Sequence, residues 1–434
     1  MFDKIKSWFA PSGTEQYKII FGRYTDSFKS KEQVAHWNNA LELGIQRQYL
    51  ESYEQFFNYL LDPAEDNVLL QKSKDSLEFT IYQGSAQIIG KAVDNRVIAE
   101  VALAQFDQPS LAVMRRLLEK NYSLRYSRYV IQDNKLTLKF DAAFEDASPE
   151  KLYFALKEVA TRADKEDDLL ITDFKQLHPI KNELNVEDIT EPSVKYDFLI
   201  KWISECLIKS EQLEHFRDEK SVAYLMAKLA LRIDYFLTPQ GKLMEANEKV
   251  LQYFMMGFLG NITTSIDKMT AIWESVLKRD KAVLIEELYN TKATFGLASA
   301  TAHVSVVDLI NGERVKLEEY IDKNRTEQAL NHLEYIPLYA LFNYGMRLPT
   351  RQVFNLLVEI CNRTFIKHIP NRRSFFVGET NQLNEEAIVG LLKEIEEEAQ
   401  MEHPGFVLST KELNFESVLR LGNGLLDIVR SLKY

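Results

Sequence analysis

The stretch LEFTIYQGSAQIIGKAVDNRVIAEVALAQF, residues 77–106, decides the fold of the first part of the chain. Apolar and polar side chains alternate through residues 77–82, as expected of a strand with one buried face. Gln83–Ser85 and Asp94–Asn95 are turn sequences, and residues 86–93 and 97–106 read as the strands that follow them. The stretch therefore predicts a three-strand antiparallel meander.

Helices and a hairpin flank this meander. Apolar residues at spacings of three, four and seven predict a helix over 31–61, and Pro109 opens a second helix. We expect the second helix to bury the stripe Leu111, Met114, Leu117 and Leu118. A strand over 122–131, a turn, a strand over 135–141 and a helix from Ser148 follow. The order helix, three strands, helix, two strands, helix predicts an α+β domain with helices on one face of the sheet.

The rest of the chain is predicted to be helical. Residues 222–237 keep a 3.6-residue apolar period, and later segments repeat it without the constant spacing of a solenoid. A polar stretch with two prolines precedes them. The predicted domains are an N-terminal extension (1–35), the α+β domain (36–168), a linker (169–193) and an all-helical domain (194–434).

The element order of residues 36–165 resembles the type III secretion chaperone-like fold, which includes the YbjN-like bacterial family. The features that carry the resemblance are the meander 77–106, the Pro109 helix, the hairpin 124–141 and the helix from Ser148. Domains of that fold bind other proteins, often as dimers, and have no catalytic residues. The resemblance therefore implies a protein-binding role and a homodimer, but it assigns no functional residue.

Composition limits the kinds of partner and the cellular compartment that the sequence suggests. The formal net charge of −11 lacks the basic excess that binding along nucleic acid requires. Cys206 and Cys361, the two cysteines, lie in apolar helical patterns, which fits a reducing cytoplasm. Residues 250–266, the longest apolar stretch, contain two glycines and are too short to span a bilayer. The aromatic face of residues 2–9 predicts a short docking helix, with an interfacial membrane anchor as the alternative.

No motif predicts catalysis, a cofactor or a metal. The seven histidines are scattered, with no pair at ligand spacing on a helix. Gly422–Gly424 and Gly90–Lys91 lack the strand-to-helix context of phosphate loops. The run from Ser299 to His303 is small-residue sequence, typical of close helix packing rather than of a nucleophile.

Two basic patches are candidates for binding. In the first, Arg115, Arg116, Arg125 and Arg128 interleave with tyrosines, but strand geometry over 122–131 would divide these aromatics between two faces. The second combines arginine with aromatic side chains, the composition of binding hot spots. It consists of Arg363, Lys367, Arg372, Arg373, Phe375 and Phe376. The alternative is that its phenylalanines fill the helical core.

The sequence favours a non-enzymatic protein-binding module of the chaperone or adaptor kind. The first alternative is an enzyme or small-molecule-binding protein with its site in the helical domain. The second is a regulatory protein with a weak nucleic-acid-binding patch.

Overall fold

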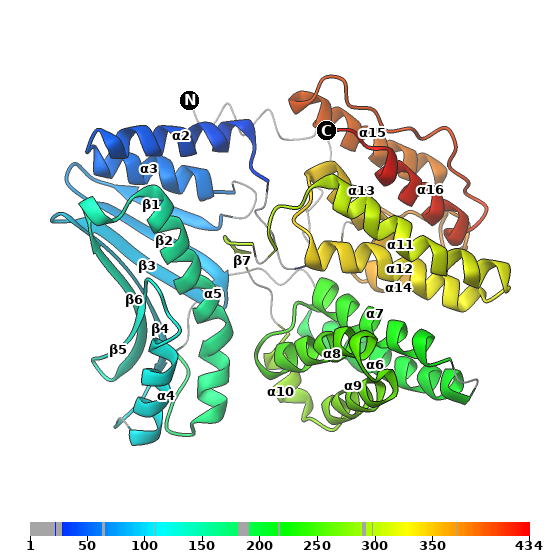
Figure 1. The fold of residues 1–434 in the computed structure, drawn as a ribbon, viewed down its shortest axis with the longest axis horizontal. Helices are drawn as coiled ribbons and strands as arrows, with labels where there is room; N and C mark the ends of the chain where they lie inside the picture. The colour runs from blue at the N-terminus through cyan, green and yellow to red at the C-terminus, as the bar shows by residue number, and fades with distance from the viewer. Residues whose placement is uncertain are drawn as a thin grey trace.

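The computed structural model describes residues 22, 28–62, 66–108, 110–180, 191–215, 218–288, 292–296, 298–370 and 372–434. Most of the predicted N-terminal extension, including the predicted docking helix over 2–9, Pro109, and residues 181–190 of the predicted linker lie outside these residues. The described residues form an α+β part followed by a helical part, which confirms the predicted fold class (Figure 1).

The α+β part is built on one antiparallel sheet with the strand order β1-β2-β3-β4-β6-β5. The predicted meander is present as β2–β4, and an additional strand, β1, pairs with β2. The strands are β1 (Val68–Lys72), β2 (Leu77–Gly84), β3 (Ala86–Val93), β4 (Arg96–Gln105), β5 (Arg128–Gln132) and β6 (Lys135–Ala143).

The predicted turns are present, and the two at 94–95 and 133–134 have the left-handed backbone conformation that matches the twist of the strands. Asp94 and Asn95 both have positive φ, as do Asp133 and Asn134. Two consecutive left-handed residues match the twist of the flanking strands, and Asp and Asn tolerate that conformation. The local sequence therefore sets the register of both hairpins.

Among the described residues, four α-helices belong to this part. Buried side chains of β2, β3, β4 and β6 face α5, which runs along the sheet (Figure 1). The helix predicted over 31–61 is two helices, because the chain turns at Arg47 with a φ of 61°. The helices are α2 (Lys31–Ile45), α3 (Tyr49–Leu60), α4 (Leu111–Asn121) and α5 (Pro149–Asp173).

The helical part packs around α7, whose side chains are buried on nearly all sides. Its first helices are α6 (Pro192–His215), α7 (Glu219–Leu237), α8 (Gly241–Leu259), α9 (Ile262–Leu277) and α10 (Lys281–Glu286). Its later helices are α11 (His303–Asp322), α12 (Thr326–Asn343), α13 (Leu348–Cys361), α14 (Arg363–Ile366), α15 (Glu385–Glu402) and α16 (Val418–Ser431).

A short segment after α10 joins the two parts. The strand β7 (Lys292–Ala293) pairs with the end of β2 and lies between the sheet and the helices (Figure 1). The side-chain oxygen of Gln83 accepts hydrogen bonds from the backbone N–H groups of Thr294 (3.2 Å) and Phe295 (2.8 Å). Phe295 is fully buried in the core of the α+β part. The helical part thus contributes a residue to the core of the other part.

Candidate functional site

The second predicted basic patch forms a hollow of about 370 Å³ in the helical part. We call it the basic hollow. Glu359 comes from the end of α13, Arg363 and Ile366 come from α14, and the loop before α15 supplies the rest. Its lining is Glu359, Arg363, Ile366, Lys367, Ile369, Arg372, Arg373, Ser374, Phe375, Phe376, Gly378 and Glu379. All six residues predicted from the sequence line this hollow.

The four cations of the hollow have different partners. Arg372 makes a two-pronged ion pair with the buried carboxylate of Glu359. Lys367 and Arg373 pair with exposed carboxylates, those of Glu379 and Glu394. Arg363 instead donates to neutral oxygens, which are the carbonyls of Gly378 (2.9 Å) and Thr380 (2.5 Å) and the side chain of Asn381 (3.1 Å).

The two phenylalanines of this patch are part of the helical core. Phe375 is 5% exposed and Phe376 is 7% exposed. The guanidinium of Arg363 lies 4.6 Å from the centre of the Phe376 ring. The rings therefore form the base of the hollow, and in this conformation they are not exposed anchors for a partner.

A second candidate surface lies on α4. Only Leu117 of the predicted buried stripe is buried, together with Val113, and both contact the sheet core. The remaining stripe residues project outward with Tyr122, and their exposures are 65% for Leu111, 38% for Met114, 70% for Leu118 and 95% for Tyr122. The prediction that Leu111, Met114 and Leu118 are buried is wrong. The helix α4 has apolar residues on two of its sides, and the sheet covers only the side that carries Val113 and Leu117.

The outward stripe has helical spacing. Leu111, Met114, Leu118 and Tyr122 follow one another by three, four and four residues, so they align along one side of α4. Four exposed arginines belong to the same stretch of chain, at positions 115 and 116 of α4, 125 of the loop that follows and 128 of β5. We call the stripe and these arginines the α4 surface.

The loop that follows α4 is held by α5. The predicted strand over 122–131 begins only at Arg128, because backbone N–H groups of residues 125–127 all donate to the carboxylate of Glu158. Burial tends to raise the pKa of Glu158, but hydrogen bonds from Ser127 and these N–H groups lower it overall. At the start of β5, the hydroxyl of Tyr129 donates to buried Glu166, which also pairs with Lys120 of α4 at 2.9 Å. The α4 surface is thus anchored at several points.

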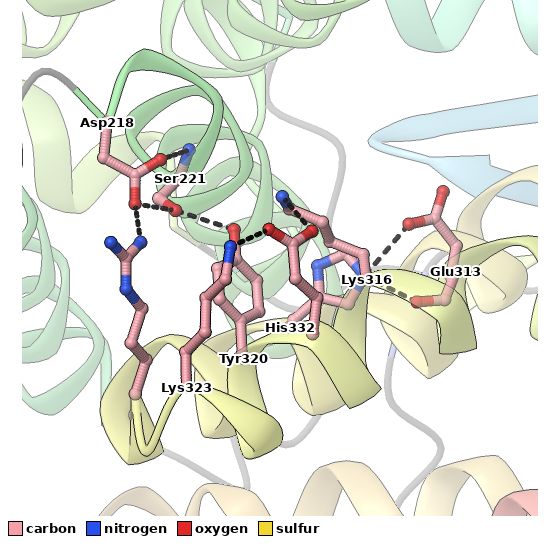
Figure 2. A network of polar contacts seen from close by, with 9 residues as sticks. Asp218, Ser221, Glu313, Lys316, Tyr320, Lys323 and His332 are labelled. Carbon is pink, nitrogen blue, oxygen red and sulfur yellow. Dashed lines mark hydrogen bonds and ion pairs between the residues drawn. The ribbon is translucent and has the colours of Figure 1, made fainter.

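A polar network connects α7, α11 and α12, as Figure 2 shows. Asp218 accepts hydrogen bonds from the backbone N–H and hydroxyl of Ser221, and from Arg325. The Ser221 hydroxyl is also 2.6 Å from that of Tyr320. These contacts cap α7 and fix its first turn to its neighbours. Ser221 has no histidine among these partners, so the arrangement lacks the base of a nucleophilic triad.

His332 forms a separate contact in the same view (Figure 2). Its Nε2 lies 3.0 Å from a carboxylate oxygen of Glu313, and its ring packs among Tyr224, Tyr320 and Tyr335. The ring is almost fully buried. The same nitrogen lies 3.1 Å from the backbone carbonyl oxygen of Glu313. His332 therefore joins α12 to α11 through polar contacts with Glu313 and through aromatic packing.

A buried ion cluster links α7, α12 and α13. Glu334 accepts two hydrogen bonds from Arg232 and one from Asn362, and it lies 3.5 Å from Lys228. Burial, and then Arg232, lowers the pKa of Lys228 to about 8. Burial alone would raise the pKa of Glu334, but Arg232 and Lys228 lower it to about 2. The sequence offered no signal for this cluster, because its members are far apart in the chain.

The run from Ser299 to His303 has a structural role in its backbone. The N–H of Gly345 donates to the carbonyl of Ser299, and the N–H of Thr301 donates to the carbonyl of Gly345. His303 Nε2 lies 3.0 Å from the carbonyl of Val429, and burial lowers the pKa of this histidine. These residues thus connect the start of α11 to the segment between α12 and α13 and to α16.

Within the described ranges, no group of three or more histidine, cysteine, aspartate or glutamate side chains is arranged to hold a metal ion. Among the helices described, none has the length and apolar character needed to cross a membrane. No protein-family model matches the chain, and no curated protein is similar to it.

Proposed function

We propose that the chain is a non-enzymatic protein-binding module of the chaperone or adaptor kind, and that its partner docks on the α4 surface. One observation carries the proposal: a solvent-facing side of α4 presents four aligned apolar side chains. Isolated exposed apolar residues are ordinary, but an aligned row beside arginines has the composition of a protein interface.

Charge indicates the chemistry of the partner. Between residues 108 and 135 there are six lysines and arginines against two acidic residues, in a chain of net charge −11. A partner helix with an apolar stripe and acidic flanks would complement this surface in both respects. A nucleic acid is contacted mainly through its phosphates, sugars and base edges, so the exposed leucines of the α4 surface do not favour nucleic acid as the partner.

The same charges oppose self-association through α4. A two-fold dimer would bring two copies of this basic surface together, so their like net charges would repel each other. We therefore propose a different protein as the occupant of this surface. The resemblance of the element order to secretion chaperone-like domains supports a protein-binding role in general.

The anchoring of the surface favours binding without large rearrangement. Glu158 and Glu166 of α5 fix the loop and the end of α4, so little conformational freedom is lost when a partner docks. A preformed apolar stripe of this kind suits a helix or an amphipathic segment that folds on it.

The test uses two peptides of identical apolar pattern. Both are model helices with leucine at positions i, i+3 and i+7, one with glutamate flanks and one with lysine flanks. We expect the glutamate peptide to bind the wild-type chain in a fluorescence anisotropy titration, and the lysine peptide to bind at least tenfold more weakly.

The variant Leu118→Asp should abolish that binding. Val315→Asp on α11 is the matched control, because Val315 is 69% exposed and Leu118 is 70% exposed. Equal binding of both peptides, or equal loss in both variants, would contradict the proposed surface. Affinity capture with the same variants from a native lysate would then identify proteins lost only with Leu118→Asp.

A further inference from the structure

We infer that the basic hollow binds a small organic anion, in which a phosphoryl or carboxylate group is attached to a compact apolar body. This inference concerns the helical part and does not depend on the α4 surface. Four features of the hollow support it. They are its charge, the capacity of its cations to bind a further anion, its preformed shape and its size.

The charge of the hollow is positive. Its lining contains four cations, at positions 363, 367, 372 and 373, and two carboxylates, at 359 and 379. The carboxylate of Glu359 already forms an ion pair with Arg372. Lys367 pairs with Glu379, and Arg373 pairs with Glu394, which lies outside the lining. Arg363 is therefore the cation of the lining whose printed hydrogen bonds all go to neutral oxygens.

The remaining cations can accept an anion at low cost. The hydrogen bonds of Arg363 go to uncharged oxygens, so they do not neutralise its charge, and its buried Nε has no partner among the described residues. Lys367 pairs with Glu379, a carboxylate that is 88% exposed. Because an exposed ion pair of this kind contributes little to stability, a ligand anion can replace such a carboxylate.

The hollow is preformed. The N–H of Asn384 donates to the carbonyl of Phe375, and the N–H of Val377 donates to that of Gln382, both at 2.9 Å, so the loop closes on itself as a hairpin. The buried rings of Phe375 and Phe376 attach this loop to the helical core. A ligand would thus meet cations that are already in place.

Size and lining define the ligand class. A volume of about 370 Å³ suits a small molecule, since ligand pockets typically span roughly 300–1,000 Å³. A partner helix, at about 10–12 Å across, is too wide to enter such a space. Ile366, Ile369 and the two phenylalanines add an apolar wall, which favours an anion that carries a ring or short hydrocarbon.

Calorimetric titration with phenyl phosphate and benzoate tests the inference and distinguishes the two anionic groups. Benzyl alcohol, which has a ring but no charge, serves as the neutral probe. We expect saturable one-to-one binding of at least one anion and none of the alcohol. Absence of saturable binding by both anions would overturn the inference.

Two variants locate the site. Arg363→Gln should weaken binding at least tenfold, whereas Arg420→Gln should leave it unchanged, because Arg420 is an exposed arginine of α16 outside the hollow. Equal weakening in both variants would show nonspecific attraction and overturn the site.

Glu379→Gln removes the carboxylate that competes with the ligand, so we expect binding to tighten about two- to fivefold. This variant decides the question if Arg363→Gln does not fold, because Glu379 is largely exposed and its loss should leave the fold intact. Unchanged or weaker binding in folded Glu379→Gln would contradict the inference.

Discussion

At the scale of single residues, the buried ion cluster of the helical part is the most informative feature. Lys228 and Glu334 are both almost fully buried, and each would be costly to bury alone. Arg232, Asn331 and Asn362 satisfy them with hydrogen bonds. Because the cluster connects three helices, it selects one arrangement of α7, α12 and α13 over others of similar apolar packing.

The cluster predicts a pH dependence of stability. The pKa of Lys228 is about 8 in the fold and has an ordinary value of 10.5, so the unfolded chain binds more protons between these values. Stability therefore gains from this group as pH rises through 8, and the cost of burying the charge is fully present below 8. Between pH 7 and 9 we expect a gain of about 1–2 kcal/mol.

Urea unfolding of wild type and Lys228→Met at pH 7 and 9 measures this gain. The difference in unfolding free energy between the two proteins should shift by that amount in favour of wild type as pH rises. Lys242→Met, at an exposed position of α8, should show no such shift. Parallel pH profiles for wild type and Lys228→Met would contradict the assignment.

At the scale of elements, a close approach in the sheet explains a glycine that the sequence shows but does not interpret. A Cβ at Gly90 would lie 2.0 Å from the buried Phe79 ring on β2 and 2.7 Å from the carbonyl oxygen of Ile98 on β4. Neither atom can move easily, because one belongs to a core ring and the other to the backbone. Gly90 therefore lets the Phe79 ring lie across β3.

We predict that Gly90→Ala lowers the free energy of unfolding by roughly 1–3 kcal/mol, the usual cost of overpacking. Gly312→Ala is the control, because an added Cβ there meets nothing within 4 Å in the middle of α11. Alanine should stabilise that helix by roughly 0.5–1 kcal/mol. Chemical denaturation of the two variants compares the effects, and a loss of equal size in both would contradict the close-approach explanation.

Element-scale prediction from sequence was accurate where the signal is local. The meander over 77–106 and the turns at 94–95 and 133–134 are determined by neighbouring residues. It was wrong for α4, where periodicity identified a helix but could not tell which of its apolar sides the sheet covers. The sequence also predicted a strand through residues 122–127. The backbone there bonds to Glu158 of α5 instead, and this long-range contact cannot be read from the local sequence.

At the scale of the whole molecule, the segment around Phe295 couples the two parts. Its ring is fully buried and packs edge-on against Tyr153 of α5, with centroids 5.5 Å apart. Thr294 is also buried, and its hydroxyl lies 2.9 Å from the carbonyl oxygen of Tyr82 and 3.1 Å from that of Asn67, so it can donate to either. The α+β part therefore cannot complete its core without a segment from the helical part.

We predict that Phe295→Ala destabilises the α+β part by about 3–5 kcal/mol and separates the unfolding of the two parts. Hydrogen exchange in increasing urea, read at β3 and at α7, measures this. Wild type should lose protection at both sites together, and the variant should lose it first at β3. Phe154→Ala is the control, since Phe154 contacts the same tyrosine but is 55% exposed. Simultaneous loss in Phe295→Ala would contradict the coupling.

The sequence by itself determined the meander, the hairpin turns, the helical second half and the residues of one basic patch, because each depends on neighbours within a few turns of chain. Tertiary structure alone decided which side of α4 is exposed, that Phe375 and Phe376 are buried beneath a hollow, and that Phe295 completes a distant core. The reason is physical. Burial and ion pairing depend on which helices and strands contact each other across the chain, and local periodicity carries no information about those contacts.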